Sequence, residues 1–495
     1  MDWSIVWLIL YVVIIASTVV VILLENRNPL KAISWLIVLL LLPIFGLLIY
    51  LIFGRDTRDK RIISKHSYDR INNAATPKVP ILPTAEGYQL REHQLLSNLI
   101  HRQTGASLME ATEIATFTDG ISKLESLLAD IEEAQEHIHI QYYRFLDDRT
   151  GIQLGEALIR KAEAGVRVRL LYDHVGSFST SNRFFNELRR HGIEAVPFMP
   201  VIFPELTSKV NYRNHRKVVV IDSCIGYIGG MNVADHYTYG NNLGQWRDTH
   251  FRITGKAVNG LQAAFLVDWY VATRKILSSH LYYHYLTPLQ NGEVNRTISN
   301  KSSAYHHAPK SYHAPMQIFT SGPTGHVRIL LQSLCKGIYQ AKRRVLIHTP
   351  YFLPTESLNK AIIGAALSGV HVELLLPWAT DTFAVKYAAH SYFQELLDAG
   401  VHIYRYDGGF LHSKLVTIDD EIAFIGSANM DFRSMEHNFE ITAVVYDARF
   451  TTQLSSMMDA DREEHGTVID SIRWQNRSIW RRLMESLLRL FAPLL

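Results

Sequence analysis

The sequence predicts an α/β protein with two repeated lobes, each built on a central mixed sheet, and an N-terminal hairpin of two transmembrane helices ahead of them. Three observations support this prediction. A short polar motif occurs twice in the 495 residues at a fixed distance, apolar strands alternate with helices in each half, and the chain begins with two long uncharged runs. Alternation of strands and helices is typical of α/β folds.

The uncharged runs predict two membrane-spanning helices within a hairpin domain at residues 1–54. They cover residues 3–24 and 32–53, 22 residues each, and about 20 apolar residues suffice to cross the hydrocarbon layer. Aromatic residues near the ends of the runs, such as Trp3 and Tyr50, are typical of membrane interfaces. The first run lacks the basic start and the cleavage site of a signal peptide, so we expect it to remain in the protein.

Basic residues predict the orientation of this hairpin. Six Lys and Arg residues lie from Arg55 to Arg70, whereas the connector from Glu25 to Lys31 holds two. The positive-inside rule then places both ends of the chain, and the lobes, in the cytoplasm. The two cysteines, Cys224 and Cys335, show no disulfide framework or metal-ligand spacing, which agrees with a reducing compartment.

The lobes are predicted at residues 111–279 and 315–468, after a linker and lead-in at 55–110. Each half repeats one order of features: a Phe-Thr turn, a helix, an apolar strand that ends in aromatic residues, and further helix–strand units. Glycines such as Gly165 and Gly369 are C-cap signals before the next strand. The matched strands are 137–145 with 345–352, and 167–171 with 371–375.

Two segments lie outside the repeat. Residues 280–314 are polar and predict an inter-lobe loop; its histidines, His306, His307 and His313, have no carboxylate or thiol cluster beside them, so we expect no metal site. Residues 469–495 predict a basic amphipathic helix. Such a helix either packs on the second lobe or lies on a membrane surface.

The motif that organises both lobes is His215-x-Lys217-x4-Asp222. It returns 197 residues later as His412-x-Lys414-x4-Asp419. The residues that follow match at the same distance: Gly229, Gly230 and Asn232 correspond to Gly426, Ser427 and Asn429. A fixed distance held over six positions indicates a true internal repeat.

The motif predicts phosphodiester chemistry. The apolar residues after each lysine form a short buried strand, and alternation along it places the His and Lys of each copy on one face. A neutral imidazole suits nucleophilic attack, a protonated one suits proton donation, and lysines stabilise phosphate oxygens. Asp222 and Asp419 have the opposite parity, so within this candidate catalytic set we expect them to hold the strand or loop. A single copy would be read more simply as an exposed strand edge.

The duplicated motif resembles the phospholipase D superfamily. That resemblance implies a two-step transfer through a phosphohistidine without metal or cofactor. It implies His215 as nucleophile, His412 as acid and then base, and an acidic residue that orients the nearby histidine in each copy: Asp248 in the first and Glu440 in the second. These two acids are 192 residues apart and so break the repeat distance. The implied phosphate contacts are Lys217, Lys414, Asn232 and Asn429, with Ser427 and Gly230 added.

The hairpin together with two motif-bearing lobes is similar to the bacterial cardiolipin synthases. This resemblance implies a multi-pass protein of the bacterial cell membrane that joins two phosphatidylglycerol molecules into cardiolipin and releases glycerol. The alternatives are a membrane-bound hydrolase, a nuclease and a non-catalytic scaffold. A net charge of +3, from 50 basic and 47 acidic residues, argues against a nucleic-acid partner.

Overall fold

A computed structural model describes residues 3–25, 29–42, 45–47, 50, 90–200, 212–277, 282, 310–323 and 327–492. The chain divides into two compact units. One contains residues 1–62, 201–212 and 323–326, and the other contains residues 63–200, 213–322 and 327–495. Both repeated lobes belong to the second unit, which carries the candidate site.

The first unit contains helices α1 (Trp3–Glu25) and α2 (Pro29–Leu41). Within the described residues, no helix has both the length and the hydropathy that a membrane crossing requires. Within the predicted second span at 32–53, α2 ends at Leu41, and residues 45–47 are again helical. Most of the run beyond Leu42, and the linker at 51–89, lie outside the described residues.

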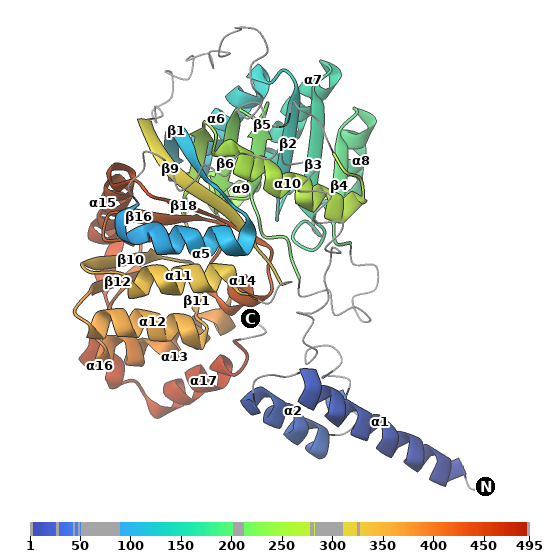
Figure 1. Cartoon of the computed structure of the whole chain (residues 1–495), viewed down its shortest axis with the longest axis vertical. Helices are drawn as coiled ribbons and strands as arrows, with labels where there is room; N and C mark the ends of the chain where they lie inside the picture. The colour runs from blue at the N-terminus through green and yellow to red at the C-terminus, as the bar shows by residue number, and fades with distance from the viewer. Residues whose placement is uncertain are drawn as a thin grey trace. The chain divides into compact units, whose positions relative to one another are not determined.

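The two predicted sheets are one continuous sheet of 15 strands, in the order β19-β13-β12-β10-β15-β16-β18-β9-β1-β8-β6-β5-β2-β3-β4. The halves mirror each other around the antiparallel pair β1–β9, in which Leu108 faces Gln317. This pairing satisfies the backbone hydrogen bonds of two strands that would otherwise be exposed edges. The lobes therefore form one rigid framework rather than two bodies on a linker (Figure 1).

The elements of the first lobe alternate as predicted. They are β1 (Leu108–Phe117), α6 (Gly120–Glu133), β2 (His137–Tyr142), α7 (Arg149–Glu163), β3 (Arg167–Asp173), α8 (Asn182–Arg190), β4 (Glu194–Phe198), β5 (Val218–Ile221), β6 (Ile225–Gly229), α9 (Asp235–Thr238), β7 (Trp246–Arg247), β8 (His250–Thr254) and α10 (Val258–Thr273).

The second lobe repeats this order. Its elements are β9 (Lys310–Ser321), α11 (Ile329–Tyr339), β10 (Arg344–His348), β11 (Phe352–Leu353), α12 (Glu356–Leu367), β12 (His371–Pro377), α13 (Phe383–Asp398), β13 (His402–Tyr406), β14 (Phe410–Leu411), β15 (Leu415–Ile418), β16 (Ile422–Gly426), β17 (Met430–Asp431), α14 (Phe432–Glu436), β18 (Glu440–Val445), α15 (Ala448–His465), β19 (Gly466–Val468), α16 (Ser471–Gln475) and α17 (Ile479–Arg489).

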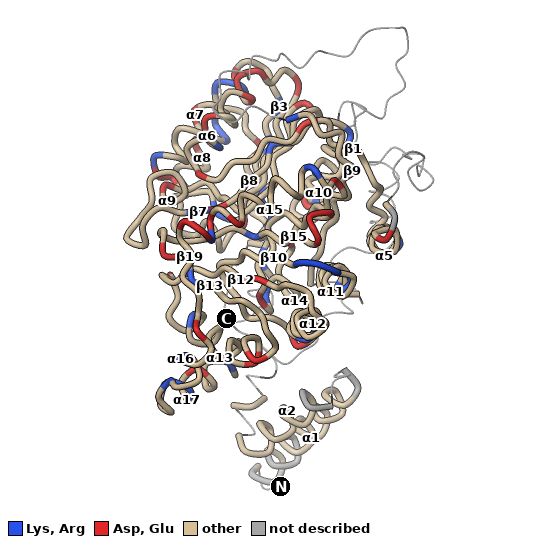
Figure 2. Tube along the Cα trace, turned by 90° about the vertical axis from the view of Figure 1, so that its left-hand side faces the viewer, with Lys and Arg blue, Asp and Glu red and all other residues tan. Residues whose placement is uncertain are grey.

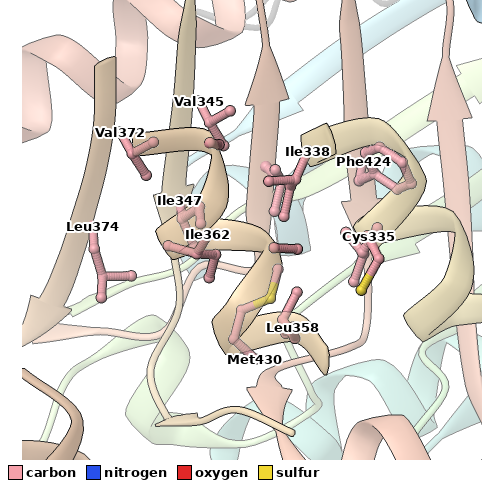
Figure 3. Packing of buried hydrophobic residues seen from close by; sticks show 14 of the residues in the cluster. Cys335, Ile338, Val345, Ile347, Leu358, Ile362, Val372, Leu374, Phe424 and Met430 are labelled. Atoms are coloured by element: carbon pink, nitrogen blue, oxygen red, sulfur yellow. The ribbon is translucent and has the colours of Figure 1, made fainter. Parts of the chain in front are cut away.

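Helices cover both faces of the sheet. In the second lobe, Cys335 and Ile338 of α11 and Ile362 of α12 pack on Val345 and Ile347 of β10 (Figure 3). Helices α10 and α15 cover the opposite face, in a core that both lobes share. Cys335 is buried and Cys224 half-buried, and within the described residues neither forms a disulfide.

Several predicted boundaries were wrong, for reasons of pairing or backbone chemistry. The strand predicted at 345–352 is split into β10 and β11 around Pro350, which has no N–H for the ladder. The inter-lobe loop ends earlier than predicted, because β9 begins at Lys310 to pair with β1. The C-terminal segment forms two helices, α16 and α17, rather than one.

Helix α5 (Gln94–Thr104), preceded by the 3-10 turn η3 (Arg91–His93), lies in the predicted lead-in to the first lobe. It nevertheless buries Leu96 and Ile100 in the core of the second lobe. Gln317 of β9 ties this helix down by donating its side-chain amide to the carbonyl of Ser97 at 3.2 Å. The segment before the first lobe thus belongs structurally to the second.

Candidate active site

Each His-x-Lys segment immediately precedes a four-residue buried strand, β5 or β15. Within a segment, the lysine folds back toward its histidine: Lys217 Nζ donates to the His215 carbonyl at 2.6 Å. In the second copy Lys414 Nζ lies 3.0 Å from His412 Nδ1 and also donates to the His412 carbonyl. The predicted placement of His and Lys on one side of the strand is therefore present in both copies.

The histidines are held by acids of the opposite lobe. His215 Nδ1 lies 3.0 Å from Glu440 Oε1, and His412 Nδ1 lies 2.6 Å from Asp248 Oδ2. The resemblance implies that each acid orients the histidine of its own copy, and this pairing is wrong. All four side chains are buried or nearly so.

The backbone explains this crossed arrangement. The His215 N–H donates to the Phe439 carbonyl at 2.9 Å, and the His412 N–H donates to the Arg247 carbonyl at 2.8 Å. In addition, β14 pairs in parallel with β7. Each motif thus runs beside the acid-bearing segment of the other lobe, which brings that acid, rather than the one in its own lobe, to the imidazole.

Asp248 and Glu440 are equivalent despite their unequal distance. Gly229 faces His250 across β6–β8, and Gly426 faces Thr442 across β16–β18, so each acid comes two residues before the partner of a motif glycine. The mismatch between 192 and 197 reflects a connection that is five residues longer in the first lobe. The longer loop alone therefore explains why the two acids do not share the 197-residue repeat distance, and the acids occupy equivalent places in the site.

Gly230 and Ser427, which we expected to contact substrate, lie against the acids instead. The Ser427 hydroxyl donates to Glu440. A Cβ atom at Gly230 would meet Asp248 Oδ1 at 2.2 Å, so only glycine leaves room for that carboxylate. The first copy therefore has glycine beside Asp248, and the second has a serine that can donate to Glu440.

Asp222 and Asp419 lie at the far ends of β5 and β15 from the histidines and are positioning residues. Asp222 accepts three backbone N–H groups, from residues 135, 136 and 137, at 2.8, 2.8 and 2.9 Å. Asp419 accepts those of residues 342, 343 and 344 at 2.8, 2.7 and 2.9 Å. These bonds fasten each motif strand to the start of the neighbouring strand, as expected for holding groups, and remove both residues from the set that faces the cleft.

Burial lowers the pKa of both imidazoles, and neighbouring charges lower the pKa of both acids. Burial, and then the charge of Lys414, lower the pKa of His412 to about 3, and burial lowers the pKa of His215 against the opposing charge of Glu440. The pKa of Asp248 is lowered although burial opposes this, because Lys414 and His412 stabilise its carboxylate. A neutral ring that donates from Nδ1 to a carboxylate keeps the lone pair of Nε2 available.

The lysines are also perturbed. Burial lowers the pKa of Lys414 to about 8 and holds that of Lys217 well below its usual range, while nearby carboxylates oppose both shifts. Burying these two lysines in one place with Asp248 and Glu440 is costly, and such clusters of buried charge are typical of functional sites.

Both histidines line one cleft of about 460 Å³. Both motif asparagines line it as well. Asn232 donates to the Tyr237 hydroxyl at 2.7 Å, and Asn429 donates to Asp431 at 3.1 Å. Among the described residues, the side-chain carbonyl oxygen of Asn429 has no hydrogen-bond partner. The remaining walls are aromatic, acidic and basic: Tyr143, Arg144, Arg213, Trp246, Tyr351, Leu353, Asp381, Thr382, Val385, Arg433 and Asn438.

Three arginines of this cleft were missed by the sequence analysis. Arg213 lies 3.7 Å from Asp173, whereas within the described residues neither Arg144 nor Arg433 forms an ion pair. Arg144 follows the aromatic end of β2, which is the one sequence signal for its position. Two guanidinium groups that form no ion pair within the described residues favour anions in the cleft, although Asp381 and Asp431 also line it.

Elsewhere, charges of both signs are interspersed along the described lobes (Figure 2). A search of the described residues for three or more clustered His, Cys, Asp or Glu side chains able to hold a metal ion finds none. Of the loop histidines, His306 and His307 lie outside the described residues, and His313 contacts Glu110 at 2.6 Å.

Comparison with known proteins assigns the class of this fold and then the family. The fold is shared with the crystal structure of phosphatidylserine synthase from Haemophilus influenzae Rd KW20, with a TM-score of 0.58 at 14% identity over 82% of this chain and 98% of that one. The family model described as "Cardiolipin synthase, PLD-like domain" matches residues 127–259 and 334–462, once in each lobe. A model described as "Phospholipase_D-nuclease N-terminal" matches residues 5–55.

Full-length relatives agree with this result. Cardiolipin synthase 2 of Bacillus cereus is 39% identical over 479 residues, covering 96% of this chain and 89% of that protein. The cardiolipin synthase of Oceanobacillus iheyensis is 38% identical over 492 residues, covering 98% of both. This chain belongs to the phospholipase D-like cardiolipin synthase family.

Proposed function

We propose that this protein is a cardiolipin synthase that transfers a phosphatidyl group from one phosphatidylglycerol molecule to another and releases glycerol. One observation carries the assignment beyond family membership: two histidines, each paired with a buried carboxylate of the other lobe, line a single cleft. Two such pairs supply the nucleophile and the proton carrier that a double displacement at phosphorus needs.

In the first half-reaction, His215 Nε2 attacks phosphorus while Glu440 stabilises the positive charge that develops on the ring. A P–N bond forms, the P–O bond to glycerol breaks, and His412 gives a proton to the leaving oxygen. The lowered pKa of His412 favours its neutral ring. The negative charge of the entering phosphodiester, together with Asp248, favours the protonated ring that this step requires.

In the second half-reaction, His412 removes the proton from a glycerol hydroxyl of a second phosphatidylglycerol. That oxygen attacks phosphorus, the P–N bond breaks, and His215 returns to its initial state. Lys217, Lys414, Asn232 and Asn429 contact the non-bridging oxygens, whose charge grows in both transition states. The unpaired Arg144 and Arg433 attract the anionic lipids into the cleft. The choice of His215 as nucleophile follows the resemblance to the phospholipase D superfamily.

We propose further that the apolar runs at 3–24 and 32–53 anchor the lobes to the cell membrane as a two-span hairpin, with the lobes in the cytoplasm. The uncharged length of both runs and the basic residues after them support this. A cysteine in place of Asn28, in the connector, should react with an impermeant maleimide added to intact cells. A cysteine in place of the exposed Gln153 should react only after lysis, and the reverse pattern would contradict the topology.

The reaction is tested with the purified full chain in vesicles of phosphatidylglycerol labelled in the headgroup glycerol. Cardiolipin with one free glycerol per molecule formed is the expected product. Phosphatidic acid with glycerol and no cardiolipin would instead identify a hydrolase. Neither product from folded protein would contradict the proposal in both forms.

A further inference from the structure

Helix α17 packs on the second lobe with its polar side. Glu485, which is 1% exposed, accepts hydrogen bonds from Arg477 and Arg481 at 3.1 Å each and lies 3.7 Å from His390 of α13. Because an unpaired buried charge is costly, this network fixes which side of the helix faces the lobe. The helix begins at a Ser478 cap that accepts the Arg481 N–H.

The apolar side of α17 and of the residues after it is therefore exposed. At 3.6 residues per turn, six large apolar side chains of this segment occupy an arc of about 120°. Each is between 47% and 77% exposed: Ile479, Trp480, Leu483, Leu487, Leu490 and Phe491. A soluble protein ordinarily turns such a stripe inward, so a contiguous exposed stripe marks a surface that meets an apolar partner.

The surrounding charge indicates which partner. From Ser471 to Phe491 the segment contains five arginines and one acidic residue, and that acid, Glu485, is already paired inside the lobe. Arg482 and Arg489 are exposed beside the apolar stripe. An apolar stripe flanked by arginines is complementary to an anionic bilayer surface, with the side chains among the acyl chains and the guanidinium groups at the phosphates.

Helix α13 connects this surface to the cleft. Its first residue, Phe383, is exposed, while the nearby Thr382 and Val385 line the cleft. Further along α13, Tyr387 lies beneath Arg481 and Tyr392 beneath Arg489 of α17. A bilayer in contact with α17 would therefore be held in a constant position relative to one wall of the cleft.

We propose that the outward face of α17 is a membrane-docking surface that binds anionic phospholipid and presents the cleft to its substrate. The proposal rests on the proposed function for the identity of that substrate, and on the geometry of α17 for the surface itself. It concerns a contact separate from the N-terminal runs.

Fluorescent labels test the contact directly. The full chain, with Cys224→Ala and Cys335→Ala, carries an environment-sensitive fluorophore on Leu483→Cys or, as the control, on Gln153→Cys in α7. In mixed phosphatidylglycerol and phosphatidylcholine vesicles, brominated lipid should quench the Leu483 label and leave the Gln153 label unchanged. Equal exposure of both labels to water would overturn the proposal. A Leu483 label shielded from water but not quenched would also overturn it, because a second copy or another segment would then cover the face.

Activity tests the purpose of the contact. Replacing Leu483, Leu487 and Leu490 together by Gln should lower the rate on vesicles about tenfold and leave the rate on dispersed short-chain phosphatidylglycerol unchanged. The control is Leu367→Gln, an equally exposed leucine on α12. Equal vesicle rates for the triple variant and wild type would overturn the proposal. If the wild-type protein makes no cardiolipin while the label on Leu483→Cys enters lipid, the proposed function alone would be refuted.

Discussion

At the scale of single residues, the crossed acids are the main finding. A carboxylate that accepts from Nδ1 fixes the tautomer of its imidazole and stabilises the charged ring. Glu440 does this for His215 and Asp248 for His412, so each histidine depends on the lobe that does not contain it. Asp248 and Glu440 occupy equivalent places in the repeat but support histidines with different roles in the proposed reaction.

This crossed arrangement predicts which variants share the same defect in forming the phosphohistidine. With a nitrophenyl phosphodiester, whose leaving group needs no proton, His412→Ala and Asp248→Asn should still form the phosphohistidine. His215→Ala should form none, and Glu440→Gln should form it about 10²–10⁴ times more slowly. Rapid-quench detection of the acid-labile phosphoenzyme provides the measurement. Grouping of Asp248 with His215 would show that each acid acts within its own copy.

Lys414 predicts the alkaline limb of the pH profile. Because burial lowers its pKa to about 8, the folded protein loses this positive charge as the pH rises through about 8, whereas an unfolded chain would retain it. The value of kcat/KM on phosphatidylglycerol should therefore fall above that pH. Lys414→Arg should shift the fall upward, while Lys275→Arg, at an exposed position, should not. An unchanged limb in Lys414→Arg would assign it to another group.

At the scale of elements, the aspartates of the motif act on backbone rather than on substrate. Each fastens the end of its motif strand to the start of β2 or β10 through three N–H groups. Asp222 itself has a φ of 50°, a conformation that Asn and Asp adopt more easily than other side chains. The third polar position of the motif is therefore a structural requirement of the fold.

Asp222→Ala should lower the free energy of unfolding by about 2–4 kcal/mol, because three backbone donors lose a charged acceptor. Asp222→Asn should cost roughly half as much, since one oxygen and the backbone preference remain. Urea unfolding followed by circular dichroism measures both, with the exposed Glu156→Ala as the control. A stable Asp222→Ala protein without activity would return this residue to the catalytic set.

At the scale of the whole molecule, the lobes are joined at three levels. They share one sheet through β1–β9, they share a core under α10 and α15, and they exchange the acids of the site. In addition, α5 from the segment before the first lobe packs into the second. One complete site therefore needs both lobes in this arrangement.

Mixing two variants tests whether both lobes of a site come from one chain. Purified His215→Ala and His412→Ala proteins, combined in the same vesicles, should show no more cardiolipin synthesis than the sum of the two alone, because both lobes of a site come from one chain. Wild type mixed with either variant serves as the control for dilution. Recovered activity in the mixture would mean that lobes are exchanged between chains.

Particular residues show how much of the candidate site could be predicted from the sequence. Equal spacing identified His215 with His412 and Lys217 with Lys414, and alternation assigned the holding role to Asp222 and Asp419. The resemblance to the superfamily implied phosphate contacts for Gly230 and Ser427, whereas the structure places both against the acids, because a residue that supports an acid and one that touches a phosphate have the same place in a motif. Arg144 and Arg433 escaped notice because a lone arginine in a loop carries no periodic signal.

The sequence by itself determined what depends on local chemistry and on the repeat: the strand and helix order, the paired motifs and the family. Tertiary structure alone decided which acid meets which histidine, that two sheets join into one, and which side of α17 faces outward. The reason is physical. Periodicity reports the conformation of a segment, whereas these three features depend on hydrogen bonds and ion pairs between residues that are distant in the chain.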